Sequence, residues 1–564
     1  MIDLSAKPFY LSKKDIAWVK ETLEQLSLEE KIGQLFCVMG IQHDKTVLSQ
    51  IINAIQPGAI MFRPDMTERI AQSVEYLQSI SKVPLLISAN LEEGAACISP
   101  ELTHFGNNMQ VAATGDSLHA YRQGLLSGTE AAGVGCNWSF SPVVDINMNF
   151  RNPITNVRSY GDAPDKVISM AKAFFKGMKE SGVAITLKHF PGDGVDERDH
   201  HLLTTCNSLS KEEWMNTFGR VYQEMIDEGA QAIMAGHITL PALQKEINPE
   251  LLDSDLKPAT LSPELLTSLL RQTLGFNGLI VTDSSLMVGL SVEAREKVVP
   301  EAIAAGCDMF LFTRNMEEDF NFMRRGVLNG TITMQRLEEA VTRILGLKAA
   351  QQIHKPRQER AVYEAASSKC VKDRSQASQW QKECIDRAIT LVKDTQQLLP
   401  IHARMHRRVL IYSLYSYENG CSHELVEAFA GSMKKQGFDV EVYDAKKASY
   451  LELFRPVGEF RSRYDLVIYL SDIKPYSNQP TLRPRYGTIY GTDFPQMTHE
   501  IPTILISFGS PYLLFDLPMM KTCINVYNNQ KETADIVVAK LTGQSEFYGI
   551  SPADPFCGVY DTKL

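Results

Sequence analysis

The sequence predicts an α/β fold in two parts, an N-terminal TIM-like (β/α)8 barrel followed by a smaller α/β/α sandwich domain. The chain has 564 residues, which is more than one ordinary domain contains. Short apolar runs alternate with longer amphipathic stretches in two separate regions of the chain. We therefore predict a barrel domain over residues 1–352, a polar helical linker over 353–390 and the sandwich domain over 391–564.

Seven short apolar runs mark strands that we expect in the barrel. Segments with helical periodicity lie between them, for example residues 165–180 and 211–229. Continuous apolar strands separated by amphipathic helices are typical of a parallel sheet covered on both faces, and about eight such units make a barrel. The apolar runs are residues 58–62, 84–88, 137–144, 184–188, 232–234, 279–282 and 309–312.

A second alternation follows the linker and predicts the sandwich domain. Helical segments at residues 422–436 and 532–542 lie among five further apolar runs. About 170 residues is enough for one sheet between two layers of helices. The apolar runs are residues 408–413, 438–443, 464–470, 503–508 and 522–526.

Composition and charge exclude several classes of function. The formal net charge is -10, which argues against a nucleic-acid backbone as the main partner. No stretch approaches the roughly 18–20 apolar residues of a membrane helix, and the charged N-terminal segment has no apolar signal-peptide core. We therefore expect a cytoplasmic protein with neither nucleic-acid nor membrane partners. The ten cysteines form no Cys-x-x-Cys pair and are expected to be buried free thiols.

The densest group of chemically active side chains follows the predicted strand that ends at Lys188. Three histidines and four acidic residues lie within the 14 positions 188–201. A strand that ends in Lys188 and His189 could point a cation and an imidazole into a cleft, and the loop then brings Asp199 and His201 two positions apart. An Asp beside a His holds the imidazole tautomer and raises its proton affinity, which suits proton transfer near neutral pH.

Two other interpretations of this loop stay open from the residues alone. The histidines and carboxylates could form a metal site, although their spacing matches no common zinc pattern. The loop could also be a solvated, charged segment without a chemical role. We predict no metal and no cofactor.

Two further polar clusters follow predicted strands. Asp283 ends the apolar run 279–282, where a buried carboxylate is costly unless it has a role; capping of a helix N-terminus is the alternative. Asp145 and Arg158 belong to a cluster of Asp, Asn and Arg residues that suits hydrogen bonding to sugar hydroxyls. From the residues alone, Asp145 and Arg158 could equally stabilise a loop.

These motifs, taken together and in order, resemble glycoside hydrolase family 3. The second region is similar to the family's second domain in ISFGSPY at 506–512 and INVYNN at 524–529. The resemblance covers nearly all of the first 350 residues and implies a TIM-like barrel. The segments that carry it there are SLEEKIGQLF at 27–36, SPVVDIN at 141–147, NP at 152–153, VRSYGD at 157–162, KHFPGDG at 188–194, PATLSPELLTSLLRQTLGFNGLIVTDSSLM at 258–287 and AGCDMFL at 305–311.

Within this family the chain is most similar to the two-domain form of the β-N-acetylglucosaminidase (β-N-acetylhexosaminidase) branch. The resemblance implies a retaining, exo-acting enzyme that hydrolyses terminal β-linked N-acetylglucosamine, with Asp283 as nucleophile of a covalent glycosyl intermediate. It also implies His201 as acid/base, with Asp199 orienting its ring. The substrate-binding residues that it implies are Asn90, Asp145, Arg158, Lys188 and His189.

Three positions differ from the usual pattern of this branch. Asn90 stands where the branch has Asp, so a negative charge is lost and the sugar preference could change. Asp193 stands where the branch commonly has His. His200 adjoins His201 and is the alternative acid/base, although the spacing from Lys188 favours His201.

Three other functions fit the same motifs. A β-glucosidase-like member would take its acid/base Glu from the second domain, and the Asp-x-His dyad argues against this. A phosphorylase would replace water by phosphate, which an imidazole, unlike a carboxylate, does not repel. A catalytically silent sugar-binding protein would not need the intact set of Asp283, Asp199 and His201. In each case the expected partner is a carbohydrate, such as a β-GlcNAc-containing oligosaccharide or cell-wall fragment, and no oligomeric state is predicted.

Overall fold

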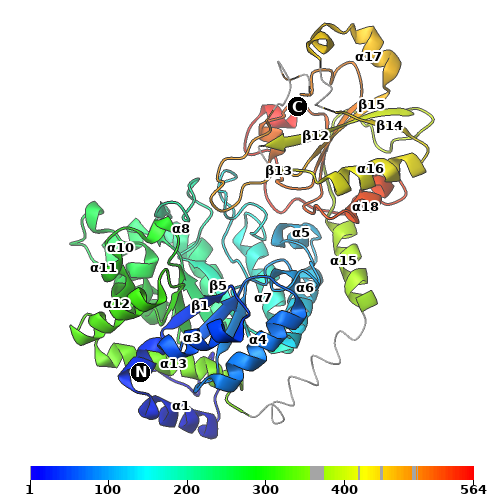
Figure 1. The fold of residues 1–564 in the computed structure, drawn as a ribbon. Coiled ribbons are helices and arrows are strands. Elements are labelled where there is room, and N and C mark those ends of the chain that lie inside the picture. Colours follow the sequence, from blue (N-terminus) through cyan, green and yellow to red (C-terminus); the bar gives the residue numbers. More distant parts are fainter. Residues whose placement is uncertain (1, 356–373, 417–418, 445–448, 486–490, 492) are drawn as a thin grey trace. The chain divides into compact units, whose positions relative to one another are not determined.

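The computed structural model describes the chain except for residues 1, 356–373, 417–418, 445–448, 486–490 and 492 (Figure 1). The part of the predicted linker at 356–373 therefore lies outside the described residues. The chain divides into two compact units. The barrel unit consists of Met1–Phe105, Ala120–Thr155 and Ala163–Ser378, and the sandwich unit of Gly106–His119, Asn156–Asp162 and Gln379–Leu564.

The barrel unit is a closed sheet of eight parallel strands, as the sequence predicted. Around the barrel the strand order is β1-β10-β9-β7-β5-β4-β3-β2. All seven residues of β5 are buried, as expected for a strand covered on both faces. The strands are β1 (Phe36–Gly40), β2 (Ala59–Phe62), β3 (Leu86–Ala89), β4 (Trp138–Ser139), β5 (Ala184–Phe190), β7 (Ala232–Ala235), β9 (Leu279–Ser284) and β10 (Met309–Leu311).

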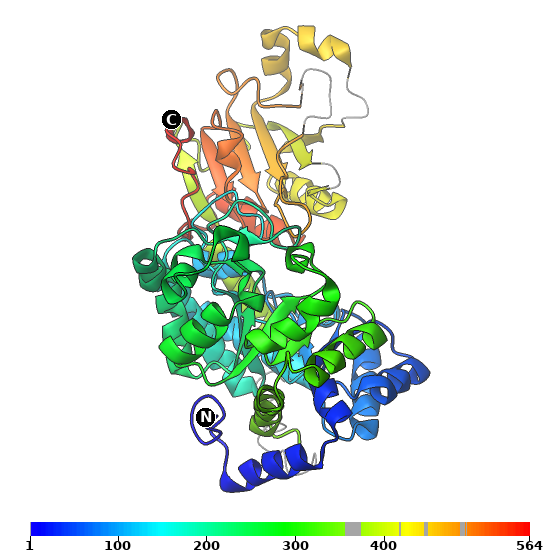
Figure 2. The same ribbon diagram turned by 90° about the vertical axis from the view of Figure 1, so that its left-hand side faces the viewer.

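Helices surround these strands (Figures 1 and 2). Ser27 and Ser210 each form a capping box with a Glu three residues later, which fixes where α2 and α8 begin. The helix predicted over 211–229 is α8 followed by a π-helical turn, Met215–Gly219, and α9. The helices are α1 (Lys13–Gln25), α2 (Leu28–Gln34), α3 (Lys45–Ile55), α4 (Thr67–Ile80), α6 (Ser117–Gly133), α7 (Pro164–Ser181), α8 (Lys211–Trp214), α9 (Arg220–Glu228), α10 (Pro241–Ile247), α11 (Arg295–Ala305), α12 (Met316–Leu328) and α13 (Met334–Ala350).

Two short segments from the barrel region of the sequence fold with the sandwich unit. One contains α5 (Asn108–Ala113), and the other is 156–162. The side-chain amide of Asn107 donates a hydrogen bond of 2.6 Å to the carbonyl of Tyr527, and Asn528 donates one of 2.8 Å to Gln110. The sandwich unit is therefore assembled from three separate stretches of the chain.

The sandwich unit contains a seven-stranded sheet. Its order is β11-β17-β16-β15-β12-β13, with β14 also paired to β12. Strands β14, β12, β15, β16 and β17 are parallel, whereas β11 and β13 run antiparallel to their neighbours. The strands are β11 (Thr390–Asp394), β12 (Arg408–Ser416), β13 (Asn419–Gly420), β14 (Asp439–Val442), β15 (Leu466–Ser471), β16 (Thr503–Ser507) and β17 (Thr522–Asn525).

Helices cover both faces of this sheet, which confirms the predicted three layers. Val409 and Ile411 of β12 point into one core together with residues of α15 (Arg374–Ala388), α16 (His423–Lys435) and α18 (Thr533–Leu541). Leu410 and Tyr412 point into the opposite core, which includes Phe460 of α17 (Val457–Arg463). Alternate residues of a strand lie on opposite faces, so both sets must be apolar.

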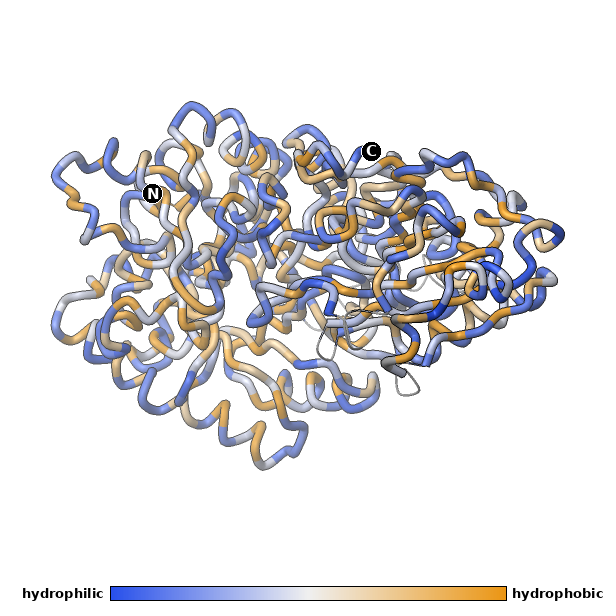
Figure 3. Tube along the Cα trace, turned by 90° about the horizontal axis from the view of Figure 1, so that it is seen from above, coloured by the Kyte–Doolittle hydropathy of each residue, from blue (hydrophilic) through white to orange (hydrophobic). Residues whose placement is uncertain are grey.

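The hydropathy of the helices agrees with this layered arrangement. Along the helices the tube in Figure 3 changes repeatedly between blue and orange, as expected for amphipathic segments.

In the described ranges no helix has both the length and the apolar character needed to cross a bilayer. The cysteines of the described residues are free thiols, and five of them, Cys37, Cys136, Cys307, Cys384 and Cys523, are buried.

Candidate active site

The candidate residues of the barrel unit lie at one end of the barrel. Asn90 follows β3, Asp145 follows β4, Lys188 and His189 end β5, and Asp283 lies near the end of β9. The strands are parallel, so their carboxyl ends form one mouth, which is where the active sites of such barrels are built. The structure therefore brings together residues that are up to 193 positions apart in the sequence.

Asp283 is a buried carboxylate at this mouth. One oxygen, Oδ1, accepts a hydrogen bond of 2.6 Å from the backbone N–H of Ser284, and Oδ2 lies 3.3 Å from Nε2 of His200. Burial alone would raise the pKa of Asp283, but the ion pair with His200 outweighs it and holds the pKa well below its ordinary value. Asp283 is therefore ionised at neutral pH, as attack on a carbon centre requires.

His200 is fully buried and connects two carboxylates. Its Nδ1 lies 2.6 Å from Oδ2 of Asp193, while its Nε2 faces Asp283. Burial opposes the charged imidazole, yet the charges of Asp193 and Asp283 outweigh this effect and raise the pKa of His200 to about 10. At neutral pH the ring is a cation beside the ionised Asp283.

The contact between His200 and Asp283 is an ion pair without hydrogen-bond geometry. Neither Nε2 of His200 nor Oδ2 of Asp283 has a hydrogen-bond partner among the described residues. A buried polar atom without a partner is costly, and such pairs occur where a ligand completes the arrangement. The side chain of Asp283 as a whole is 12% exposed, so part of it remains accessible.

Asp199 and His201 form the predicted dyad. One carboxylate oxygen of Asp199 lies 2.8 Å from Nδ1 of His201 and also accepts the backbone N–H of His201 at 2.8 Å. The side chain of Asp199 is fully buried and that of His201 is 22% exposed, so the carboxylate of the dyad is held in the interior while the imidazole is accessible to solvent. The rings of His201 and His200 are stacked, with centroids 4.8 Å apart.

The loop that carries both histidines is attached to neighbouring elements. The backbone N–H of Val288, just after β9, donates a hydrogen bond of 2.8 Å to the carbonyl of His201. Downstream, β6 (Thr205–Cys206) pairs with β8 (Ile238–Thr239). These contacts fix the position of the dyad relative to β7 and β9.

Asp145 supports the backbone of the same loop. Its Oδ1 accepts the backbone N–H groups of His189 (3.0 Å) and Asp193 (2.8 Å), and its Oδ2 lies 2.7 Å from Nδ1 of His189. Burial lowers the pKa of His189 although the charge of Asp145 opposes this shift. His189 is therefore neutral, donates from Nδ1 to Asp145 and has Nε2 as an acceptor.

Lys188 is buried and bridges two groups that follow β3. Its Nζ lies 2.5 Å from Oε1 of Glu92 and donates to Oδ1 of Asn90 at 3.3 Å. With Asn at position 90, one ammonium faces one carboxylate, whereas an Asp there would add a second negative charge. Sequence reasoning missed Glu92, although it lies only two positions from Asn90.

Arg158 is the one predicted site residue outside the barrel unit. It belongs to segment 156–162 of the sandwich unit, where its carbonyl accepts a hydrogen bond of 2.8 Å from Asn108. The remaining predicted residues, Asn90, Asp145, Lys188, His189, Asp199, His201 and Asp283, all belong to the barrel unit.

The same mouth contains a possible set of metal ligands. His189, His200 and Asp283 each offer one ligand atom, and these atoms lie within 4.8 Å of one another. A metal-bound imidazole must be unprotonated, so a cation would have to displace a proton from His200, whose pKa is about 10. The arrangement suits a hydrogen-bonding and charge-stabilising site better than a metal centre.

Comparison with known proteins relates this geometry to one family. The chain matches the glycosyl hydrolase family 3 N-terminal domain over residues 27–347. It is 43% identical to a β-N-acetylglucosaminidase/β-glucosidase of Cellulomonas fimi, with 100% of both chains covered. It is also 31% identical to β-hexosaminidase A of Pseudoalteromonas piscicida over 53% of this chain and 54% of that protein.

Solved structures show the same two-part architecture. The β-glucoside phosphorylase BglX is 38% identical and has a TM-score of 0.92, with 99% of both chains covered. A β-N-acetylglucosaminidase from a Paenibacillus species, 24% identical, shares the fold with a TM-score of 0.75, over 95% of this chain and 100% of that one. The family match covers more than half of the chain, and the Cellulomonas relative matches it over its full length. This chain therefore belongs to glycoside hydrolase family 3 and is an enzyme.

Proposed function

We propose that this enzyme is a retaining, exo-acting β-glycosidase that removes terminal β-linked N-acetylglucosamine through a covalent intermediate on Asp283. The observation that carries the proposal is the ionised, buried Asp283 beside the Asp199–His201 dyad at the barrel mouth. A nucleophilic carboxylate and a separate proton donor are what the double-displacement reaction requires. The proposed substrates are β-GlcNAc-containing oligosaccharides or cell-wall fragments.

In the first step, the carboxylate of Asp283 attacks the anomeric carbon and the glycosidic C–O bond breaks. The departing oxygen takes a proton from Nε2 of His201, so the leaving group departs as a neutral alcohol. Asp199 accepts the Nδ1–H of His201 and stabilises the positive charge that the ring carries before this transfer.

In the second step, the neutral His201 accepts a proton from a water molecule through Nε2. The resulting hydroxide oxygen attacks the anomeric carbon from the face opposite Asp283, and the bond to the carboxylate breaks. Two inversions restore the original β configuration, and His201 regains its proton. The enzyme returns to its starting state.

The sugar is held by the other groups at the mouth. His189 offers the acceptor Nε2 to a sugar hydroxyl, and Lys188 offers the third N–H of its ammonium group, which Glu92 and Asn90 do not use. Asp145 fixes the ring of His189, so it supports the pocket from behind. Arg158 is proposed as a further hydroxyl-binding residue.

The experiment compares release of nitrophenol from the β-N-acetylglucosaminide and from the β-glucoside. We expect turnover of both with a preference for the acetylated sugar, since the full-length relative from Cellulomonas fimi carries both activities in its name. Asp283→Ala should lower turnover by about 10³-fold or more. Activity on the glucoside alone, or an unaffected Asp283→Ala variant, would contradict the proposal.

A second candidate is phosphorolysis, in which phosphate replaces water in the second step. Two observations favour it: the acid/base is an imidazole that does not repel an anion, and the chain resembles a β-glucoside phosphorylase over 99% of its length. Adding inorganic phosphate separates the two acceptors. Faster turnover with a sugar 1-phosphate product would assign a phosphorylase, and an unchanged rate with free sugar a hydrolase.

A further inference from the structure

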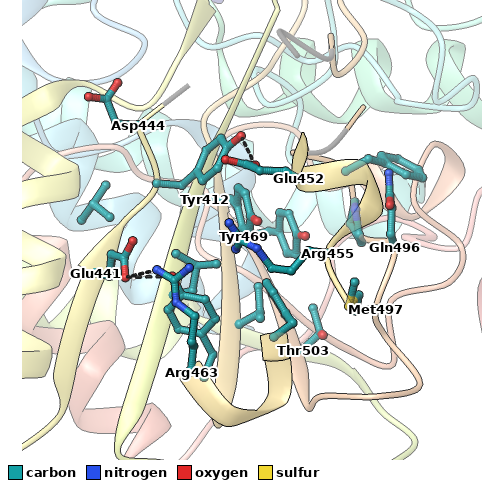
Figure 4. Close-up of a pocket in the computed structure, with 18 residues that line it drawn as sticks. Tyr412, Glu441, Asp444, Glu452, Arg455, Arg463, Tyr469, Gln496, Met497 and Thr503 are labelled. Atoms are coloured by element: carbon teal, nitrogen blue, oxygen red, sulfur yellow. Dashed lines mark hydrogen bonds and ion pairs between the residues drawn. The ribbon is translucent and has the colours of Figure 1, made fainter. Parts of the chain in front are cut away.

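A cavity of about 320 Å³ lies within the sandwich unit, on the face of the sheet covered by α17 (Figure 4). Leu410 and Tyr412 of β12 and Val467 and Tyr469 of β15 form its floor. None of the proposed catalytic residues Asp283, Asp199 and His201 belongs to this unit. None of the residues proposed for the reaction site lines this cavity.

Two tyrosines on the floor present hydroxyl groups to this cavity. Tyr412 and Tyr469 are paired in register on neighbouring strands, and their rings stack with centroids 4.9 Å apart. The two residues are only 6% and 4% exposed. A hydroxyl group that lines a cavity can donate a hydrogen bond to a polar ligand and accept one from it.

The walls of the cavity combine hydrogen-bond acceptors with a hydrogen-bond donor. Tyr464 donates a hydrogen bond of 2.8 Å to Glu441, and Tyr443 donates one of 3.2 Å to Glu452, so two carboxylates are oriented along the cavity. Arg455 also lines it and extends toward Tyr469 in Figure 4. The ion pair of Arg455 is a long contact of 3.8 Å from Nε to Glu459, which leaves its terminal N–H groups for a ligand.

The charges that line the cavity and its volume restrict the class of ligand that it can bind. The described lining residues include the carboxylates of Glu441 and Glu452 and the guanidinium groups of Arg455 and Arg463. A polyhydroxylated neutral ligand can use these donors and acceptors together. The volume is at the lower end of the roughly 300–1,000 Å³ of small-molecule pockets, which suits one sugar ring.

We infer that this cavity is a non-catalytic binding site for an uncharged monosaccharide. The sugar hydroxyls bind the hydroxyls of Tyr412 and Tyr469, the guanidinium of Arg455 and the carboxylates of Glu441 and Glu452. The aromatic walls pack against the apolar C–H faces of the ring. The site goes beyond the proposed reaction because it requires no bond to be made or broken.

Equilibrium dialysis with radiolabelled N-acetylglucosamine and glucose tests this inference on the full chain. The double variant Tyr412→Phe/Tyr469→Phe keeps both rings and removes both hydroxyls, so we expect affinity at this site to fall by about tenfold or more. Tyr560→Phe, at a tyrosine that is 78% exposed, is the matched control and should bind like the wild type. Both variants should retain wild-type turnover of nitrophenyl glycosides.

The number of bound sugars separates this inference from the proposed function. If the number of bound sugars falls from two equivalents in the wild type to one in the double variant, the result supports both this site and the proposed function. A fall from one equivalent to none supports this site but not sugar binding at the reaction site. Unchanged binding by the variant would overturn the inference, as would binding of glucose 1-phosphate but not of glucose. Arg455→Gln, with the exposed Arg461→Gln as its control, provides a second test should the double variant fail to fold.

Discussion

The Nε2 atom of His200 lies 3.3 Å from Oδ2 of Asp283, while the Nδ1 atom of the same ring lies 2.6 Å from Asp193. One buried imidazole therefore joins the proposed nucleophile to a second carboxylate. Because both carboxylates favour the protonated ring, His200 places a positive charge beside Asp283 in the free enzyme. Its effect on the reaction is then electrostatic: it keeps the nucleophile ionised.

Replacing His200 by Gln should move the acidic limb of the profile of kcat/KM against pH to higher pH. Without the imidazolium, burial dominates and raises the pKa of Asp283, so the carboxylate becomes protonated at higher pH. The shift is measured with the nitrophenyl substrate. Asp193→Asn should shift the limb in the same direction, because it lowers the proton affinity of His200. An acidic limb that stays in place in both variants would refute this role.

The positive charge on His200 should make the free energy of unfolding depend on pH. The pKa of His200 rises from 6.5 to about 10 on folding, so protonation stabilises the folded state fully below about pH 6.5. This stabilisation is lost as the pH rises toward 10. The difference in Tm between the wild type and His200→Gln should therefore be largest near pH 6 and shrink toward pH 10, as thermal denaturation would show. A difference that grows with pH would contradict the assignment.

Replacing His201 by Ala should reduce turnover by an amount that depends on the leaving group. For substrates whose leaving oxygen needs a proton, we expect a loss of about 10²–10⁴-fold, because general acid catalysis disappears. For a dinitrophenyl glycoside, which departs without protonation, bond cleavage should be far less affected. Asp199→Asn should give the same pattern with smaller losses. Equal losses for both kinds of substrate would exclude His201 as the acid.

The ion pair of the buried Lys188 with the partly buried Glu92 should govern stability as well as sugar binding. Lys188→Met leaves the carboxylate of Glu92 without its ion-pair partner, which should cost about 3–5 kcal/mol of unfolding free energy. The double variant Lys188→Met/Glu92→Gln removes both charges and should recover most of this loss in urea denaturation. Its activity should stay low because the donor for the sugar is absent. A double variant as unstable as the single one would show that the two charges do not compensate each other.

The strands were predictable where the apolar runs were continuous. The run 184–188 became β5, and 279–282 became β9. By contrast, the run 137–144 yielded only Trp138–Ser139 as a regular strand, because the chain soon reaches Pro142, which has no N–H to donate to a ladder. Strand β1 was missed because it follows α2 after a single residue. Strand β11 was missed because its segment TLVKD has only two apolar residues and lies next to a polar helix.

The candidate site was predictable in its residue types but not in its connections. Asp199 and His201 are close in sequence, so their pairing followed from local spacing, and the structure confirms the contact. Asp193 and His200 were noted only as separate departures from the family pattern. In the structure the side chains of Asp193 and His200 contact each other, and this contact forms only because the loop folds back over seven positions. The link from His200 to Asp283 spans two strand ends and could come only from the closed barrel.

The segments that join the sandwich unit have a consequence for biosynthesis. Asn107 and Tyr527 form a hydrogen bond across 420 positions of the chain. At roughly 5–20 residues per second, a ribosome needs about 20–80 seconds to make that stretch. During this interval α5 and its neighbours have left the exit tunnel while the sheet on which they pack has not been synthesised. The nascent chain therefore exposes the buried residues of α5 until its last strands emerge, and this is the period in which a chaperone would be needed.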